Sequence, residues 1–253
     1  MTGKNLSLAL VSSLVLTALS ASVQAQDWRY GIGTGPQALA VDGDMGFNTT
    51  TFGPVEFSID LDAEETSDML ESAFGLGGYA SNGTWTISGG FGTVTLQGKA
   101  SDGITKLITE FEITSGELMV GYNVSRTESL SVDLLGGIRY MNHDLSTEVT
   151  QGDTKIKRNV ENDWTDALVG ISFRVPLNDN WAWNTRFDAG FGGSEGTFSG
   201  NTGLVWRFTE GWSATFFAKL QAIDFEEGSK GDSDWYLYDM DETTLGLTIL
   251  YNW

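Results

Sequence analysis

The chain contains no cysteine, and its main part has no long apolar run. Without cysteine it can form neither a disulfide framework nor a lipid-modified cysteine behind a leader peptide. After Ala25, no continuous apolar stretch approaches the roughly 20 residues that a transmembrane helix needs. If this chain is integral to a membrane, it must be a closed barrel of strands, because lipid offers no partners to unpaired backbone N–H and C=O groups.

Basic residues are scarce as well. The 253 residues include 14 Lys and Arg against 34 Asp and Glu, which gives a formal net charge of -20 at pH 7. Such a surface repels phosphate backbones, so nucleic acid is a poor partner. The sequence contains no metal-ligand cluster, nucleophile elbow or phosphate-binding loop, so we expect neither a metal site nor a cofactor.

The N-terminus has the pattern of an export signal. Lys4 supplies a positive charge, residues 6–19 are apolar apart from small hydroxylated residues, and Val23, Gln24 and Ala25 fit a cleavage site. We therefore expect residues 1–25 to be a cleaved signal peptide. The mature domain would then cover residues 26–253 and begin at Gln26.

Apolar and polar residues alternate along most of the mature chain, as in strands with one face in lipid. Trp183 and Phe187, for example, alternate with Arg186 and Asp188. This pattern predicts an all-β fold, a closed antiparallel transmembrane barrel of about ten strands. Eight strands are the alternative, because the glycine-rich first segment has a weak pattern. The predicted strands cover residues 28–35, 72–81, 84–97, 107–122, 127–141, 163–176, 180–192, 199–208, 211–224 and 243–253.

The alternation also separates a lumen side from a lipid side. Ionisable residues of both signs face inward, where we expect them to pair and fill a narrow lumen; they are Asp133, Arg139, Asp166, Arg174, Arg186, Asp188, Arg207 and Lys219. Four tryptophans beside short turns are expected to form an aromatic girdle; they are Trp28, Trp85, Trp181 and Trp212.

Short polar turns join the strands at one end and longer, acidic connections at the other. This asymmetry is typical of outer-membrane barrels, whose short turns lie in the periplasm. Within the first long connection, Asp62 and Glu65 have the spacing of a capping box, which predicts a short helix over residues 62–72, either in the barrel mouth or outside it. The long connections are predicted near residues 36–68, 98–106, 142–162, 192–198 and 225–241.

The last segment carries the most specific signal. Its apolar residues share one face and end on an aromatic; they are Leu245, Leu247, Ile249, Tyr251 and Trp253. This ending resembles the C-terminal assembly signal of Gram-negative outer-membrane barrels, although those mostly end on Phe. The mature chain as a whole resembles the small single-chain barrels of the OmpA-like and OmpW-like group. The resemblance implies residence in the outer membrane, insertion by the barrel assembly machinery, and contact with outer-membrane lipid and lipopolysaccharide.

Three functions are compatible with such a barrel. Our first interpretation is a non-enzymatic structural or surface-interaction protein whose lumen is filled by paired charges, and the second is a small porin-like channel. The third is a hydrolase that would use His143, the only histidine, with Ser146 in a loop beyond a strand end.

The carboxylates of residues 224–242 are candidate ligands for divalent cations at the outer loops, although a solvated acidic loop is favoured.

Overall fold

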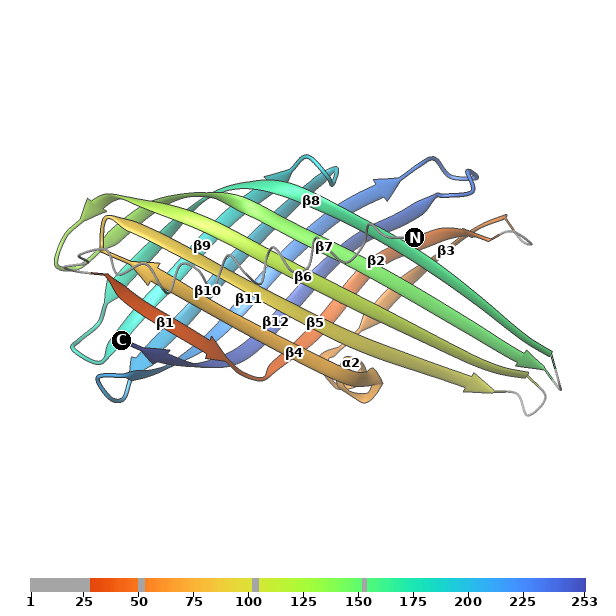
Figure 1. Ribbon diagram of the computed structural model, residues 1–253, viewed down its shortest axis with the longest axis horizontal. Coiled ribbons are helices and arrows are strands. Elements are labelled where there is room, and N and C mark those ends of the chain that lie inside the picture. Colours follow the sequence, from red (N-terminus) through yellow and green to blue (C-terminus); the bar gives the residue numbers. More distant parts are fainter. Residues whose placement is uncertain (1–27, 50–52, 102–104, 152–153) are drawn as a thin grey trace, which may run out of the picture.

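The fold is a single barrel of long, tilted antiparallel strands (Figure 1), described here from a computed structural model. The structure describes residues 28–49, 53–101, 105–151 and 154–253. The expected signal peptide, its cleavage site and Gln26 lie outside these residues. The strands are β1 (Arg29–Thr34), β2 (Gln37–Thr49), β3 (Gly53–Leu61), β4 (Leu70–Ser81), β5 (Trp85–Ser101), β6 (Thr105–Arg126), β7 (Ser131–Gln151), β8 (Thr154–Pro176), β9 (Trp181–Phe191), β10 (Gly196–Arg207), β11 (Trp212–Glu227) and β12 (Tyr236–Asn252).

The barrel closes through β1, which pairs with β4 on one side and with β12 on the other. The closing ladder runs from Gly31 opposite Asn252 to Thr34 opposite Ile249. Tyr30 and Trp253 extend it by exchanging backbone hydrogen bonds of 3.0 and 3.1 Å. β1 and the nine strands β4 to β12 therefore form a closed ring of ten strands, which confirms the prediction of about ten over the alternative of eight.

Beyond this ring, β2 continues the path of β1 along β12. The two strands are separated at Gly35 and Pro36, where a side chain in place of Gly35 would collide with the carbonyl oxygen of Leu247. β2 then pairs with β3. The expected loop over residues 36–68 is therefore wrong in large part, because most of it forms the β2–β3 hairpin.

The predicted helix is present as α2 (Ala63–Met69), directly after β3. It is shorter than predicted, because residues 70–72 already belong to β4. Its capping box is complete, since the Asp62 carboxylate accepts from the N–H groups of Glu64 and Glu65 at 2.8 and 2.9 Å, and Glu65 accepts from the Asp62 N–H at 3.1 Å. α2 contacts β2, β5 and β3, so it lies where the wall passes from β3 to β4. Among the described residues, no helix has the length and hydropathy needed to cross a membrane.

Several strands continue far past their predicted ends. Residues 142–151 and 154–162 form the upper parts of β7 and β8 instead of the expected loop, and residues 225–227 and 236–241 belong to β11 and β12. The expected connection over 98–106 is likewise mostly strand. We call the end of the barrel with the short turns the turn end, and the opposite end, where these strands project, the loop end (Figure 1).

The reason for this error is a reversal of polarity along the projecting strands, as β7 shows. Near the turn end of β7, Leu134 and Ile138 point outward and are each 52% exposed, as a lipid-facing row requires. Further along β7, the outward row becomes polar, with Asn142, Asp144 and Ser146, whereas the inward row becomes apolar and buried. A strand pattern defined by outward apolar residues stops at this reversal, although the strand itself continues.

The reversal predicts that the same substitution is costly at one position on the outward face of β7 and tolerated at another. Ile138→Arg should cost about 2–4 kcal/mol, because it places a charge in the lipid-facing band. The matched variant Ser146→Arg should fold like the parent, since Ser146 lies in the polar row. Urea unfolding in lipid vesicles, followed by tryptophan fluorescence, measures both. Equal effects of the two variants would contradict the boundary placed between these residues.

Candidate functional site

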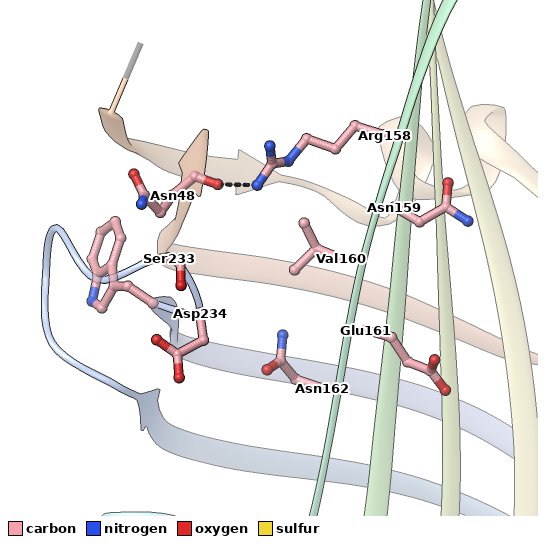
Figure 2. Close-up of a pocket in the computed structure, with 9 residues that line it drawn as sticks. Asn48, Arg158, Asn159, Val160, Glu161, Asn162, Ser233 and Asp234 are labelled. Atoms are coloured by element: carbon pink, nitrogen blue, oxygen red, sulfur yellow. Dashed lines mark hydrogen bonds between the residues drawn. The ribbon is translucent and has the colours of Figure 1, made fainter. Parts of the chain in front are cut away.

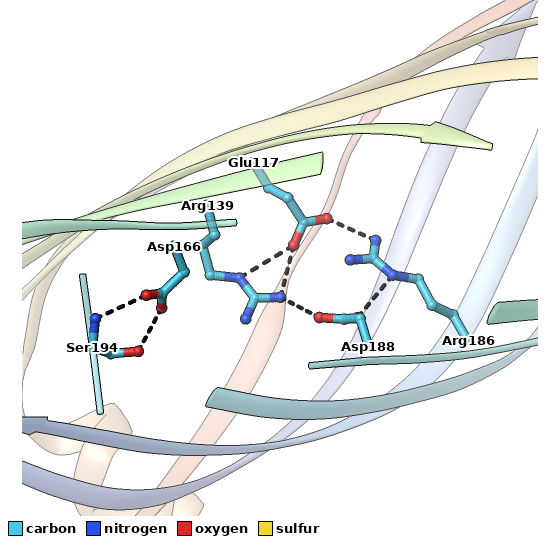
Figure 3. Close-up of polar contacts among 6 residues, drawn as sticks. All are labelled: Glu117, Arg139, Asp166, Arg186, Asp188 and Ser194. Carbon is cyan, nitrogen blue, oxygen red and sulfur yellow. Dashed lines mark hydrogen bonds and ion pairs between the residues drawn. The ribbon is translucent and has the colours of Figure 1, made fainter. Parts of the chain in front are cut away.

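The lumen contains a closed ring of four charged side chains from three strands (Figure 3). Arg139 on β7 binds Glu117 on β6 at 2.8 Å and Asp188 on β9 at 2.9 Å. Arg186 on β9 binds the same two carboxylates, Glu117 at 2.7 Å and Asp188 at 2.9 Å. Two arginines thus alternate with two carboxylates, and the ring carries no formal net charge.

Burial makes this ring dependent on all four members. The side chains of Arg139 and Asp188 are only 4% and 1% exposed, whereas those of Glu117 and Arg186 are each 25% exposed. A charge at such a place is tolerated because its partners replace the lost water, and removing one partner leaves the others uncompensated. The ring therefore fills and braces the lumen at the height of the lipid-facing band.

The structure brings together three of the predicted lumen charges, namely Arg139, Arg186 and Asp188. Their fourth partner, Glu117, was not among the predicted residues, although the alternation of Glu117 with Leu118 and Met119 carried a usable signal. Met119 is 1% exposed and Leu118 is 43% exposed, so Glu117 shares the inward face with Met119.

The other predicted lumen charges lie apart from the ring. Asp166 is fully buried and accepts a hydrogen bond from the backbone N–H of Gly193. It also accepts from the backbone N–H and the hydroxyl of Ser194 (Figure 3). Lys219 is half-buried within electrostatic reach of the ring and of Glu242. The remaining three lie toward the turn end, where Asp133 accepts from Asn123 at 2.6 Å, Arg174 is exposed, and Arg207 is exposed and donates to the carbonyl of Asp179.

Above the ring, toward the loop end, the lumen is filled by an aromatic and methionine cluster. Trp164 and Phe225 stack with ring centroids 4.0 Å apart and an angle of 12° between their planes. Each member is at most 5% exposed, as in the core of a soluble domain. We call this set the lumen core; it consists of Met45, Met141, Leu145, Trp164, Ile223, Phe225, Tyr236, Tyr238 and Met240.

His143 is part of this filling and not part of a loop. It lies within β7, is 1% exposed, and its Nδ1 is 2.9 Å from the hydroxyl of Tyr236. Burial above the lipid-facing band lowers the pKa of His143 to about 3, so the imidazole is neutral at physiological pH. The expected loop position of His143 is therefore wrong. Ser146, three residues further along β7, lies on the opposite face of the strand, and the structure does not bring the two together.

A polar layer closes over the lumen core at the loop end. Arg158 on β8 reaches across the mouth and donates to the carbonyl of Asn48 at the end of β2, at 2.5 Å (Figure 2). A depression of about 210 Å³ lies beside this bridge, with Asn162, Asp234 and Trp235 in its wall. The mouth is thus crossed by a side chain from the opposite wall.

The outer wall at the loop end carries aspartates in register on neighbouring strands. Asp224, Asp239 and Asp44 stand opposite one another on β11, β12 and β2. A second row of this kind is formed by Asp241, Asp42 and Asp60 on β12, β2 and β3. Partial burial and the carboxylates of Asp224, Asp44 and Asp241 raise the pKa of Asp239. No group of three or more acidic or histidine side chains in the described part of the chain has the geometry of a metal site.

Aromatic residues gather at the turn end, near both ends of the described chain. Trp85 lies 4.7 Å from Tyr122, Trp181 lies 5.6 Å from Trp206, and Trp212 lies 5.1 Å from Tyr251, measured between ring centroids. Trp28 precedes β1 at the same end. The outward face of β12 carries the predicted assembly residues, which are Leu245, Leu247, Ile249, Tyr251 and, directly after the strand, Trp253.

Comparison with known proteins shows the fold of this chain and no closer kinship. No family model matches, and no curated protein matches in sequence. The chain is similar to the outer membrane protease OmpT from Escherichia coli, with a TM-score of 0.60, 7% identity, and coverage of 90% of this chain and 97% of OmpT. The translocator domain of the autotransporter NalP from Neisseria meningitidis gives a TM-score of 0.48, 12% identity, and coverage of 96% and 95%. The likeness to OmpT shows that this chain has the fold of an outer-membrane β-barrel, and at this identity it says nothing of activity.

The charged ring predicts a large loss of stability from one substitution. Arg139→Met should lower the free energy of unfolding by about 3–5 kcal/mol, because Glu117 and Asp188 then share only Arg186. Lys155→Met is the matched control, since the Lys155 side chain is 60% exposed and loss of its pair with Glu148 should cost less than about 1 kcal/mol. Urea unfolding of the refolded protein measures both, and equal costs would show that the ring does not brace the lumen.

The burial of His143 predicts a pH dependence. Its pKa in the folded state, about 3, lies below the ordinary value of 6.5, so the unfolded chain binds a proton that the folded chain excludes. Stability should therefore fall as the pH drops below 6.5, by about 2 kcal/mol between pH 7 and pH 5 from this group. His143→Phe keeps an aromatic ring and removes the titration. Unfolding measured at both pH values should show a smaller loss of stability in this variant than in the parent. An equal loss would indicate that His143 is accessible to water in the folded protein.

Proposed function

We propose that this chain is an integral outer-membrane barrel with a sealed lumen, acting through its outer surface as a structural or surface-interaction protein. The observation that carries the proposal is the filling of the lumen by two layers of different chemistry. The charged ring occupies the height of the lipid-facing band, and the lumen core occupies the projecting part above it.

The two layers would resist water and ions for different reasons. In the lumen core, the apolar side chains exclude water, and an ion entering it would lose its hydration without gaining partners. In the ring, arginine and carboxylate groups already neutralise each other, so a passing ion would have to displace a salt bridge. Because the layers lie in series along the lumen, opening one of them would leave the other in place.

Placement in the membrane follows from the ends of the barrel. The turn end carries the short turns, the aromatic residues and both ends of the described chain, which supports a periplasmic position for it. Export through a cleaved signal peptide and insertion by the barrel assembly machinery, guided by the face of Leu245 to Trp253, belong to this proposal. The loop end, with its polar outer wall, would then project from the cell.

The surface role would rest on the aspartate rows of the loop end. Opposed carboxylates on neighbouring strands repel one another and attract counterions. Divalent cations that also bridge lipopolysaccharide phosphates are suitable counterions, because carboxylate and phosphate oxygens are the ligands that such cations prefer. The proposed partners are therefore outer-membrane lipid, lipopolysaccharide and divalent cations held at the acidic wall.

A sealed lumen predicts that the refolded protein does not conduct. Inserted into planar bilayers, it should give no discrete current steps, because both lumen layers block the path. Successful insertion is verified first, by the mobility difference between heated and unheated protein in gel electrophoresis. An authentic porin, treated in the same way, serves as the positive control.

Discrete, reproducible conductance steps of the unaltered protein would overturn the sealed lumen. They would support the porin-like alternative instead, for which the 25% exposure of Glu117 and Arg186 indicates an approach for water to the ring. In that case Arg186→Glu should change the ion selectivity of the steps, since it reverses a charge on the conducting path.

A further inference from the structure

The wall of the barrel has an open seam at the loop end. β3 pairs with β2 along one edge, and no described strand pairs with its other edge. β4 meets β5 no further than Leu96, so the described part of β5 beyond this residue pairs only with β6. The two free edges diverge above α2 (Figure 1). A row of backbone N–H and C=O groups on β3 is thus available to another extended chain.

β3 presents two different faces along this free edge. Val55, Phe57 and Ile59 share the inward face, because they stand opposite inward residues of β2 such as Met45 and Phe47. Val55 and Phe57 remain 36% and 39% exposed, although they belong to the lumen side. The outward face carries Glu56, Ser58 and Asp60. A strand added here would gain most if it alternated apolar residues inward with basic residues outward.

The residues around the edge are rich in carboxylates. The stretch from Asp42 to Glu71 includes most of β2 and all of β3 and α2, and it contains no Lys or Arg. A basic side chain reaches the edge from the connection between β11 and β12, where Lys230 pairs with Glu56. Its carboxylates are those of Asp42, Asp44, Glu56, Asp60, Asp62, Glu64, Glu65, Asp68 and Glu71. Opposite charge near a free edge would raise both the association rate and the affinity of a basic strand.

We propose that the free edge of β3 binds an extended cationic peptide whose apolar and basic residues alternate, which joins the wall as an additional antiparallel or parallel strand. Main-chain hydrogen bonds would supply affinity, and the two faces of β3 would select the side chains. A second copy of this chain fits poorly. Two antiparallel β3 edges centred on Ser58 would bring Glu56 of one copy opposite Asp60 of the other, which is repulsive.

Ordinary protection of an edge strand does not account for these features. Pro54 removes one donor, but it lies at the start of β3 and leaves the following residues able to pair. Edge strands are often guarded by charged side chains that point inward, whereas the inward residues of β3 are apolar. The outward acids repel another acidic strand but favour a basic one, so the edge discriminates between occupants by charge.

The test uses the full barrel in a nonionic detergent and a fluorescent peptide of sequence Lys-Val-Lys-Phe-Lys-Val-Lys. Fluorescence anisotropy should show saturable binding. The double variant Glu56→Lys/Asp60→Lys should weaken it at least tenfold, because the outward face of β3 becomes basic and Lys230 loses its partner Glu56. The matched control Asp179→Lys/Glu210→Lys makes the same change of net charge in exposed turns at the turn end, and it should bind like the parent.

Backbone pairing is tested separately from charge. N-methylation of alternate residues in one phase of the peptide should abolish binding, whereas methylation in the other phase should be tolerated, because only one row of N–H groups faces β3. A peptide of the same composition with its lysines in one block should bind at least tenfold more weakly. Equal binding of these peptides, or equal loss in the two double variants, would overturn the proposal. Conductance is measured independently, so the sealed lumen and the peptide edge can fail separately.

Discussion

The structure depends on the pairing of every lipid-crossing backbone segment with a neighbour on both sides. Hydrocarbon offers no hydrogen-bond partner, so an open sheet edge within it would cost several kcal/mol for each unpaired group. The short ladder between β1 and β12 satisfies this constraint, and the exchange of hydrogen bonds between Tyr30 and Trp253 completes it at the turn end. Everything else in the molecule is arranged around that closed ring of ten strands.

This constraint applies only within the lipid, and the polarity of the two faces of the wall changes where the lipid ends. Beside the lipid-facing band, the wall is apolar outside and charged inside, with the Arg139 and Arg186 ring as the filling. Above it, the wall is polar outside and apolar inside, with Trp164 and Phe225 stacked at the centre. The projecting part is thus built like a soluble β-barrel. It can also leave β3 with a free edge, because water there satisfies the groups that lipid could not.

The sequence predicted the membrane-embedded part well, because one repeating rule governs it. Alternation placed the turn ends of the strands, and the capping box of Asp62 and Glu65 placed α2. The same rule failed above the band, where Asn142 and Asp144 read as loop residues and His143 as an exposed one. Glu117 was missed although its strand alternates clearly. Pairings across the lumen, such as that of His143 with Tyr236, depend on the packing of strands far apart in sequence, which no local pattern encodes.

The interruption at Gly35 and Pro36 has a consequence for the geometry of the wall. Because of this interruption, β12 pairs with two strands along the same edge. It pairs with β1 near the turn end and with β2 toward the loop end. The partners joined near the turn end, Gly31 and Asn252, stand at almost opposite ends of the described chain. A contact so distant in sequence gains its pairing energy only after the intervening strands have been brought together. The ladder between β1 and β12 is therefore expected to be the last pairing of the ring to form.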